Sequence, residues 1–253
     1  MSNNFETPEA LRSLGTPLRV HPPRAAAGRA GYLTIAAVFL GVAGLAAIGI
    51  VNPPQHNPPP AVVLMSAMGV CCVLSVVFFG VGMYVQSYTL ILFPEALART
   101  GGDVPEIFRW SDVKELYTFI NPVAGRHRIV TQDGRKLDID ARVQGGKELG
   151  NTVQQILFDR MRPDAVRTFE GGGMLTFGPL RLDQTSLYYK EKRLAWDGIA
   201  KMGLLYNAYS RSVQFEVKAA GSAFLPWCVV KSQDIPNLDI FKMLAERKKS
   251  FTR

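Results

Sequence analysis

The densest group of cationic side chains after residue 85 is Lys190-Glu-Lys-Arg193. Each lysine or arginine near an anionic surface adds about 1 kcal/mol of attraction. The group lies between two strand-like segments, so Lys190, Lys192 and Arg193 are candidate contacts for an anionic lipid or a protein partner. The alternative is a solvated hairpin turn, since charge clusters usually mark solvent.

Groups suited to catalysis do not converge in this sequence. His127 is the only histidine after residue 85, which excludes a histidine metal cluster in that region. Cys228 with His127 is the one nucleophile candidate, but Cys228 follows Trp227 in an apolar run, as buried structural cysteines do. The segment Gln144-Gly-Gly-Lys147 lacks the earlier glycine and the following Ser or Thr of a phosphate loop. We therefore expect no enzyme, no catalytic residue, no metal and no cofactor.

Two tryptophans mark an internal repeat. Trp110-Ser-Asp-Val113 matches Trp196-Asp-Gly-Ile199 at a separation of 86 residues, and Gly134 and Gly221 are 87 apart. Two candidate C-terminal helices follow at a separation of 85. Such regular spacing predicts two copies of one unit, each with several strands followed by a helix. Trp110 and Trp196 are then either ligand platforms or aromatic side chains that hold the helix against the core.

The positions of these elements follow from local patterns. Charged and apolar residues alternate over 136–141 after Asp133-Gly134, which predicts a β-hairpin with 129–131. Apolar residues at helical spacing predict a helix over 148–161 that ends before Pro163. The remaining expected elements are strands at 86–93, 175–182, 212–218 and 223–230, and a helix at 237–248. The repeats thus span 86–165 and 173–249, joined near Glu170-Gly-Gly-Gly173.

Two uncharged apolar runs precede the repeats, at 32–51 and 61–85, with a proline-rich connection at 52–60. A run of about 20 apolar residues is the length needed to cross a bilayer core. The sequence therefore predicts a two-helix transmembrane hairpin. Small residues on the first run either allow close helix packing or are merely tolerated there. These residues are Ala37, Gly41, Gly44 and Ala47.

The distribution of lysine and arginine predicts the orientation of this hairpin. Four arginines lie before residue 32, none lies in the connection, and the other 25 of the 29 Lys and Arg residues follow residue 85. Positive flanks stay in the cytoplasm. We therefore expect an integral plasma (inner) membrane protein, with both termini cytoplasmic and residues 1–31 forming a disordered cytosolic tail. A cleaved signal peptide is disfavoured by the length of the first run and by the second run behind it.

The overall charge and the cysteines narrow the function classes further. The net charge of +8 is explained by the positive-inside bias and by proximity to anionic lipid, so we expect no nucleic-acid partner. Cys71 and Cys72 are adjacent inside the second apolar run, and Cys228 is distant from both. This pattern is not a disulfide framework and is typical of a reducing compartment.

The repeats resemble bacterial pleckstrin-homology-like domains, many of which follow two membrane spans. The resemblance covers residues 30–249 and is carried by short motifs in each copy. These motifs are Phe108-Arg-Trp-Ser-Asp-Val113, Asp133-Gly-Arg135 and Leu149-Gly150 in the first copy, and Phe177-Gly-Pro-Leu180, Leu187-Tyr-Tyr189, Leu194-Ala-Trp-Asp-Gly-Ile199 and Ile235-Pro-Asn-Leu238 in the second. The order of parts is also similar to a family of uncharacterised bacterial membrane proteins.

The resemblance implies tandem bent sheets or barrels, mainly antiparallel β within an α+β class, each capped by a C-terminal helix. Such domains bind lipids, peptides or proteins, so fold analogy predicts a binding module. We expect a membrane-anchored scaffold that recruits a cytosolic protein partner through its tandem domains. The alternative is a lipid sensor that uses Lys190, Lys192 and Arg193, and an enzyme is the third hypothesis.

Overall fold

The computed structural model divides the chain into two compact units. It describes residues 9–23, 27–51, 61–84, 88–102, 104–120, 125–209, 212–222 and 225–249, and in the two longest apolar helices it describes the side chains of 32–48, 51, 63 and 65–79. One unit holds residues 22–89 and 101–104, and the other holds residues 1–21, 90–100 and 105–253. Apart from residues 86–89 and 101–104, both predicted repeats lie in the larger unit. Each unit is described by itself below.

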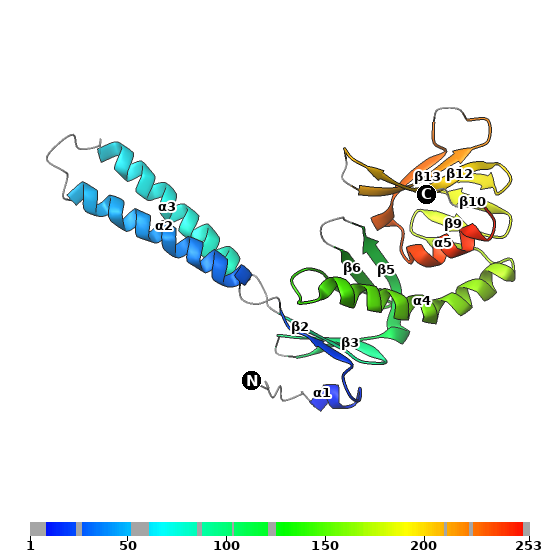
Figure 1. Ribbon diagram of the computed structural model, residues 1–253, viewed down its shortest axis with the longest axis horizontal. Coiled ribbons are helices and arrows are strands. Elements are labelled where there is room, and N and C mark those ends of the chain that lie inside the picture. Colours follow the sequence, from blue (N-terminus) through cyan, green and yellow to red (C-terminus); the bar gives the residue numbers. More distant parts are fainter. Residues whose placement is uncertain are drawn as a thin grey trace. The chain divides into compact units, whose positions relative to one another are not determined.

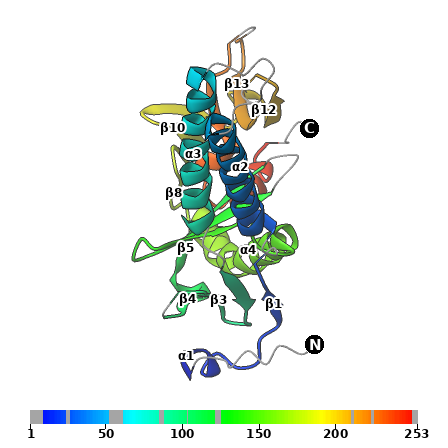
Figure 2. The same ribbon diagram turned by 90° about the vertical axis from the view of Figure 1, so that its left-hand side faces the viewer.

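The smaller unit is a pair of helices, α2 (Ala27–Val51) and α3 (Ala61–Tyr84). The two helices lie side by side in both views of the ribbon (Figures 1 and 2). The Ser75 hydroxyl is buried between them and donates to the Ala36 carbonyl at 3.1 Å. The rings of Phe39 and Phe78 stack with their centroids 5.8 Å apart.

Of the two roles left open for the small residues Ala37, Gly41, Gly44 and Ala47, the structure favours mere tolerance over close helix packing. Among the side chains of α2 that the structure describes, Ala36 and Ala43 are buried, Ala47 is half-buried and Ala37 is exposed. A Cβ added at Gly41 or Gly44 would meet nothing within 4 Å, so neither glycine is needed for close approach. The buried residues Ala36 and Ala43 thus each lie one position before a residue of this stripe, Ala37 and Gly44.

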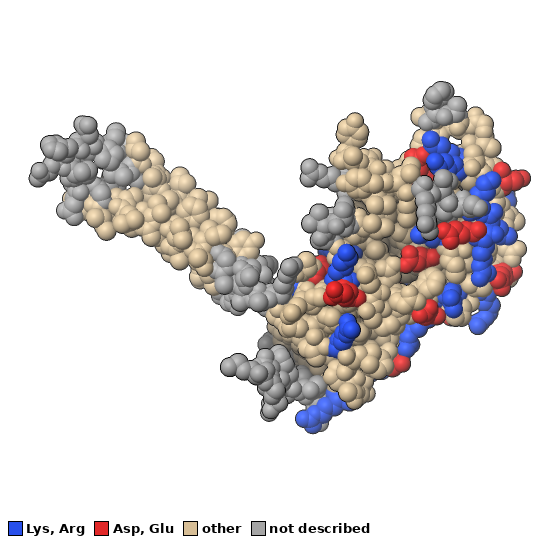
Figure 3. Space-filling model, viewed as in Figure 1, with Lys and Arg blue, Asp and Glu red and all other residues tan. Residues whose placement is uncertain are grey.

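The prediction of a transmembrane hairpin at 32–51 and 61–85 is wrong. Among the residues that the structure describes, no helix combines the length and the hydropathy needed to cross a membrane. A bilayer core requires about 20 consecutive apolar residues. The integral plasma-membrane localisation depended on this hairpin and is corrected with it. The outward faces of α2 and α3 do carry large apolar side chains, and their described atoms show no charged residue in Figure 3.

The larger unit begins with a four-stranded antiparallel sheet, followed by a three-stranded one and a long helix. The first sheet has the order β1 (Arg19–His21), β2 (Thr89–Leu92), β3 (Ala96–Thr100) and β4 (Glu106–Arg109). A 3-10 turn η1 (Trp110–Asp112) leads to the second sheet, β5 (Val113–Phe119), β6 (Arg126–Thr131) and β7 (Lys136–Ile139). Helix α4 (Gly146–Glu170) follows.

The second half of this unit repeats the same order. Its four-stranded sheet contains β8 (Leu175–Phe177), β9 (Leu180–Leu182), β10 (Ser186–Tyr189) and β11 (Lys192–Ala195). The three-stranded sheet contains β12 (Ile199–Asn207), β13 (Ser212–Ala219) and β14 (Cys228–Lys231), followed by η2 (Ser232–Asp234) and α5 (Leu238–Glu246). Strand order within each sheet matches between the halves, with β1 corresponding to β8.

The equivalence of the halves extends to single hydrogen bonds. The indole N–H of Trp110 donates to the Pro94 carbonyl at 2.9 Å, and that of Trp196 donates to the Asp183 carbonyl at the same distance. The β5–β6 register shifts between Val113 and Glu115, and the β12–β13 register shifts 86 residues later, between Ile199 and Lys201. A β-bulge at the same position in both halves gives their strands the same local bend.

The N-terminal segment is part of the first half. We expected residues 1–31 to be a disordered tail, but β1 pairs with β2 in an antiparallel register. Leu11 of the short helix α1 (Glu9–Arg12) is fully buried in a cluster with Ile91 of β2 and Phe93 just after it. In the second half, a two-residue turn joins β8 to β9 at the corresponding point. The segment that contains α2 and α3 is thus an insertion between the first two strands of the first half.

Two further expectations differ from the structure. The segment 175–182 was expected to be one strand, but Gly178 adopts a φ of 61° and turns the chain between β8 and β9. Helix α4 was expected to end before Pro163, but it continues to Glu170. Its later turns pack against the core of the second half, where Phe169 is buried and Met161 is partly buried. This packing outweighs the one backbone hydrogen bond that proline removes.

Candidate functional site

The predicted cations lie on the hairpin formed by β10 and β11. Lys190 and Glu191 form its two-residue turn, and Lys192 and Arg193 begin β11. Antiparallel pairing places Arg193 opposite Tyr188, and Tyr188 opposite Arg181 of β9. Because directly paired residues share one face of a sheet, Arg181, Tyr188 and Arg193 form one row across three strands. We call Arg181 and Arg193 the cation row. Lys190 lies in the turn beside this row, and Lys192 pairs with Tyr189 and therefore faces the other side of the sheet.

Tyr188 holds the two arginines of this row in place. The guanidinium carbon of Arg181 lies 5.7 Å from the centre of the Tyr188 ring, and that of Arg193 lies 5.8 Å from it. The Tyr188 hydroxyl donates to an Asp183 carboxylate oxygen at 3.0 Å. Burial raises the pKa of Asp183, while hydrogen bonds from Thr185 and other neighbours lower it, and the net shift is downward. The carboxylate that anchors the tyrosine is therefore charged at neutral pH.

Neutral groups, not carboxylates, orient the arginines. The Arg193 Nε–H donates to the Ser186 hydroxyl at 2.8 Å, and Arg181 donates to the Lys190 carbonyl at 2.8 Å. Over the described part of the chain, no carboxylate lies within ion-pair distance of the cation row. The row thus presents positive charge that the protein itself does not neutralise, which favours an anionic ligand group.

Sequence reasoning missed Arg181 and Tyr188. Arg181 lies nine residues before Lys190, in a segment expected to be one strand with 175–182. Only the turn at Gly178 and the register between β9 and β10 bring it beside Tyr188. The local sequence offered one signal for Tyr188: it follows the apolar Leu187, which is buried, so Tyr188 points to the other face of the strand.

The turn residue Lys190 allows a test of the local backbone. Its φ of 54° lies in the left-handed region, which is unfavourable for lysine and well tolerated by asparagine. Replacing Lys190 by Asn relieves the backbone strain but loses the contact of the Lys190 ammonium with the Tyr189 ring. The net effect is expected to be an increase of about 0.5 kcal/mol in the free energy of unfolding. Urea unfolding would measure this. The control is Lys192→Asn, at an ordinary strand position, which should give no gain, and equal gains from both variants would contradict the strain argument.

The two tryptophans are packed into the structure. Trp110 is 3% exposed and Trp196 is 7% exposed, and each indole N–H is bonded to a backbone carbonyl. Their position favours the packing role over the ligand platform, because little ring surface is available for a ligand.

His127 and Cys228 do not form a nucleophilic pair. Cys228 is buried in the core of the second half, and burial raises its thiol pKa to about 12. His127 is buried in the first half, where its Nε2 lies 2.9 Å from Gln154 Oε1, and burial lowers its pKa. A thiol of such high pKa without a neighbouring base is unreactive at neutral pH. Gln144-Gly-Gly-Lys147 forms the entry to α4, and the Gln144 carbonyl contacts His21 Nδ1 at 3.0 Å.

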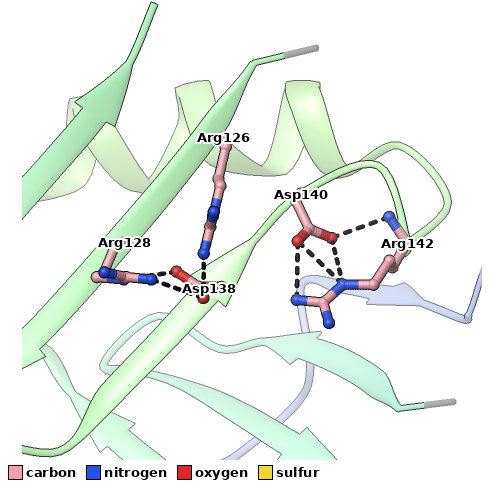
Figure 4. Close-up of polar contacts among 5 residues, drawn as sticks. All are labelled: Arg126, Arg128, Asp138, Asp140 and Arg142. Atoms are coloured by element: carbon pink, nitrogen blue, oxygen red, sulfur yellow. Dashed lines mark hydrogen bonds and ion pairs between the residues drawn. The ribbon is translucent and has the colours of Figure 1, made fainter. Parts of the chain in front are cut away.

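A second set of charges lies on the outer face of the first half's three-stranded sheet (Figure 4). Arg126 and Arg128 of β6 both contact the carboxylate of Asp138 on β7, at 2.7 and 2.8 Å. Asp140 pairs with Arg142 at 2.8 Å just beyond β7. Burial raises the pKa of Asp138 and the arginine hydrogen bonds lower it, with a net downward shift. Asp138 and Asp140 are charged positions of the alternation over 136–141, and both are engaged in ion pairs.

A hollow opens beside these ion pairs, between the first and second halves of the larger unit. It has a volume of about 560 Å³ and is lined by the end of β5, the start of β6, the segment after β7, the start of β13, and η2. A neighbouring hollow of about 530 Å³ shares Phe119 and Gln233 with it. Among the described residues there is no group of three or more potential metal ligands.

Comparison with known proteins gives a family and no relative of known activity. No curated protein matches the chain. Over residues 1–253 the sequence matches a family described as "Family of unknown function (DUF6585)". With a match that covers its whole length, this chain belongs to the DUF6585 family.

Proposed function

We propose that this protein is a binding module that recruits a protein partner through the cation row. The observation that supports this most directly is a pair of arginines, Arg181 and Arg193, oriented by neutral groups, with no carboxylate partner within ion-pair distance among the described residues. The row lies on strands, so the ligand groups are held by a rigid scaffold. An acidic segment of a partner protein supplies the complementary charge.

The repeat also supports a binding role over an enzymatic one. Within the described residues, each half has seven strands in two antiparallel sheets followed by a helix. The pleckstrin-homology-like domains that the sequence resembles recognise lipids, peptides and proteins, so the argument from fold is one of analogy. The argument from the site is independent of it and rests on Arg181, Tyr188 and Arg193.

The proposal predicts salt-sensitive binding of an acidic peptide. The full chain should bind a fluorescent octaglutamate peptide at low salt, measured by anisotropy, and release it as ionic strength rises. Replacing Arg181 and Arg193 together by Gln should weaken binding about tenfold, because exposed charge pairs contribute up to about 1 kcal/mol each. The matched control is Arg162→Gln with Arg167→Gln, which removes two exposed cations from α4.

The lipid alternative is tested in the same experiment. Vesicles that contain phosphatidylserine replace the peptide, with phosphatidylcholine vesicles as the blank. Binding to the anionic vesicles with no binding of octaglutamate would replace the protein-partner proposal by the lipid one. Equal peptide binding by the wild type and the Arg181/Arg193 variant would reject the cation row as the site.

A further inference from the structure

We infer that the two hollows between the halves of the larger unit form a second binding site, for an extended polypeptide segment of low net charge. The hollows share Phe119 and Gln233, so they form one trough along the outer face of β5–β6–β7. Binding sites are common where two domain-like halves meet, and each hollow falls within the usual size range for a ligand pocket. We call this feature the junction trough.

The floor of the junction trough has the period of an extended chain. Phe119 pairs with Arg126, and Tyr117 with Arg128 and through it with Asp138. Successive rows along the strands are two residues apart, a rise of about 6.6–6.8 Å. An extended peptide that runs along the strands points every second side chain toward the sheet, at the same interval as the rows. Each of these side chains therefore meets one row.

The charge of the trough favours a polypeptide over a polyanion. Four cations, Arg126, Arg128, Lys136 and Arg142, line it together with the carboxylates of Glu115, Asp140 and Asp234. Asp138 lies at the base and binds two of these arginines. Positive and negative groups therefore balance, in contrast to the cation row. A polyanion such as a nucleic acid gains little from a surface whose arginines are already neutralised.

An aromatic and aliphatic group at one end supplies an anchor. Phe119 is half-buried, and the guanidinium carbons of Arg126 and Arg128 lie 5.0 and 5.7 Å from its ring centre. Ile120 beside it is 40% exposed, and Val213 lines the same hollow. A large apolar side chain of the peptide fits between these groups, and its burial supplies the hydrophobic part of the affinity.

The second half completes the trough. Asn237 lies just before α5 and makes two hydrogen bonds with Leu116 of β5. Its side-chain Oδ1 accepts from the Leu116 N–H at 2.9 Å, and its backbone N–H donates to the Leu116 carbonyl at 2.8 Å. These bonds fix η2 beside β5 and therefore fix Gln233 and Asp234 as one wall. Neither half alone has both walls, so the site exists only in the tandem arrangement.

The test is selection of peptides from a displayed library of random twelve-residue sequences on the immobilised full chain. Enriched peptides of mixed charge with a conserved large apolar residue are expected. Phe119→Ala should weaken their binding about tenfold. Gln233→Ala should weaken it by the same factor and removes only a half-exposed amide, so it remains a valid test if Phe119→Ala fails to fold. The Arg181/Arg193 variant should bind these peptides as the wild type does, which separates the junction trough from the cation row.

Three results would overturn the inference. The first is an absence of peptides enriched over the blank surface. The second is binding that neither Phe119→Ala nor Gln233→Ala weakens. The third is enrichment of polyacidic peptides only, with binding lost in the Arg181/Arg193 variant, which would support the proposed function and reject the trough.

Discussion

Replacing Asn237 by alanine is expected to lower the free energy of unfolding by about 3–4 kcal/mol. The change removes the side-chain acceptor of the Leu116 N–H and the donor to the Lys114 carbonyl, at 2.9 and 3.3 Å. Each such bond contributes about 1 kcal/mol, and an N–H left without a partner adds to the loss. Asn237 also has a φ of 51°, which costs alanine about 1–2 kcal/mol. Urea unfolding followed by tryptophan fluorescence would measure the effect.

Two companion variants separate the causes. Asn237→Gly keeps the backbone conformation and loses both side-chain bonds, so its loss should be smaller than that of alanine by the strain energy. Asn237→Asp keeps the acceptor for the Leu116 N–H and should be the mildest of the three. If all three variants unfold within about 0.5 kcal/mol of the wild type, the bonds between the halves do not contribute to stability, and the rigid wall of the junction trough loses its support.

Sequence patterns located those elements whose signal is local. The β6–β7 hairpin is confirmed, because Asp133-Gly134 and the alternation after it are a short-range signal. The 86-residue spacing of the tryptophans corresponds to equivalent positions in the two halves, where both indoles make the same kind of hydrogen bond. Repeats of this kind can be detected without knowledge of the fold, since packing constraints recur with the unit.

The errors concern contacts between residues that are distant in sequence. β1 pairs with β2 although residues 22–88 separate them, and three residues of strand carry no local pattern that announces such a pairing. Helix α4 passes Pro163 because the second half packs against its later turns, and local rules cannot anticipate that support. Arg181 joined the candidate site only through register. The transmembrane interpretation relied on the length and apolar character of the runs at 32–51 and 61–85, and the described helices do not meet its requirement.

The close contact between α4 and β6 gives the second prediction with a large effect. Gly150 of α4 lies over the ring of His127, and a Cβ at this position would overlap Nδ1 and approach Cγ to 3.0 Å. The ring is 2% exposed and its Nε2 is held by Gln154, which also donates to Asp239 of α5. The ring therefore has no room to move away. Gly150→Ala is expected to lower the free energy of unfolding by about 3 kcal/mol, although alanine is the better helix former.

A double-mutant cycle identifies the overlap as the cause. His127→Ala removes the ring, so adding Gly150→Ala to it should cost at least about 1 kcal/mol less than Gly150→Ala does alone. Additive losses would place the destabilisation elsewhere in α4. The burial that lowers the pKa of His127 implies a neutral ring, and in the described structure its buried Nδ1 has no hydrogen-bond partner. Glycine at position 150 thus allows α4 to pack closely on His127 of β6. His127 is hydrogen-bonded to Gln154, and Gln154 donates to Asp239 of the second half, so replacing Gly150 should destabilise both halves together.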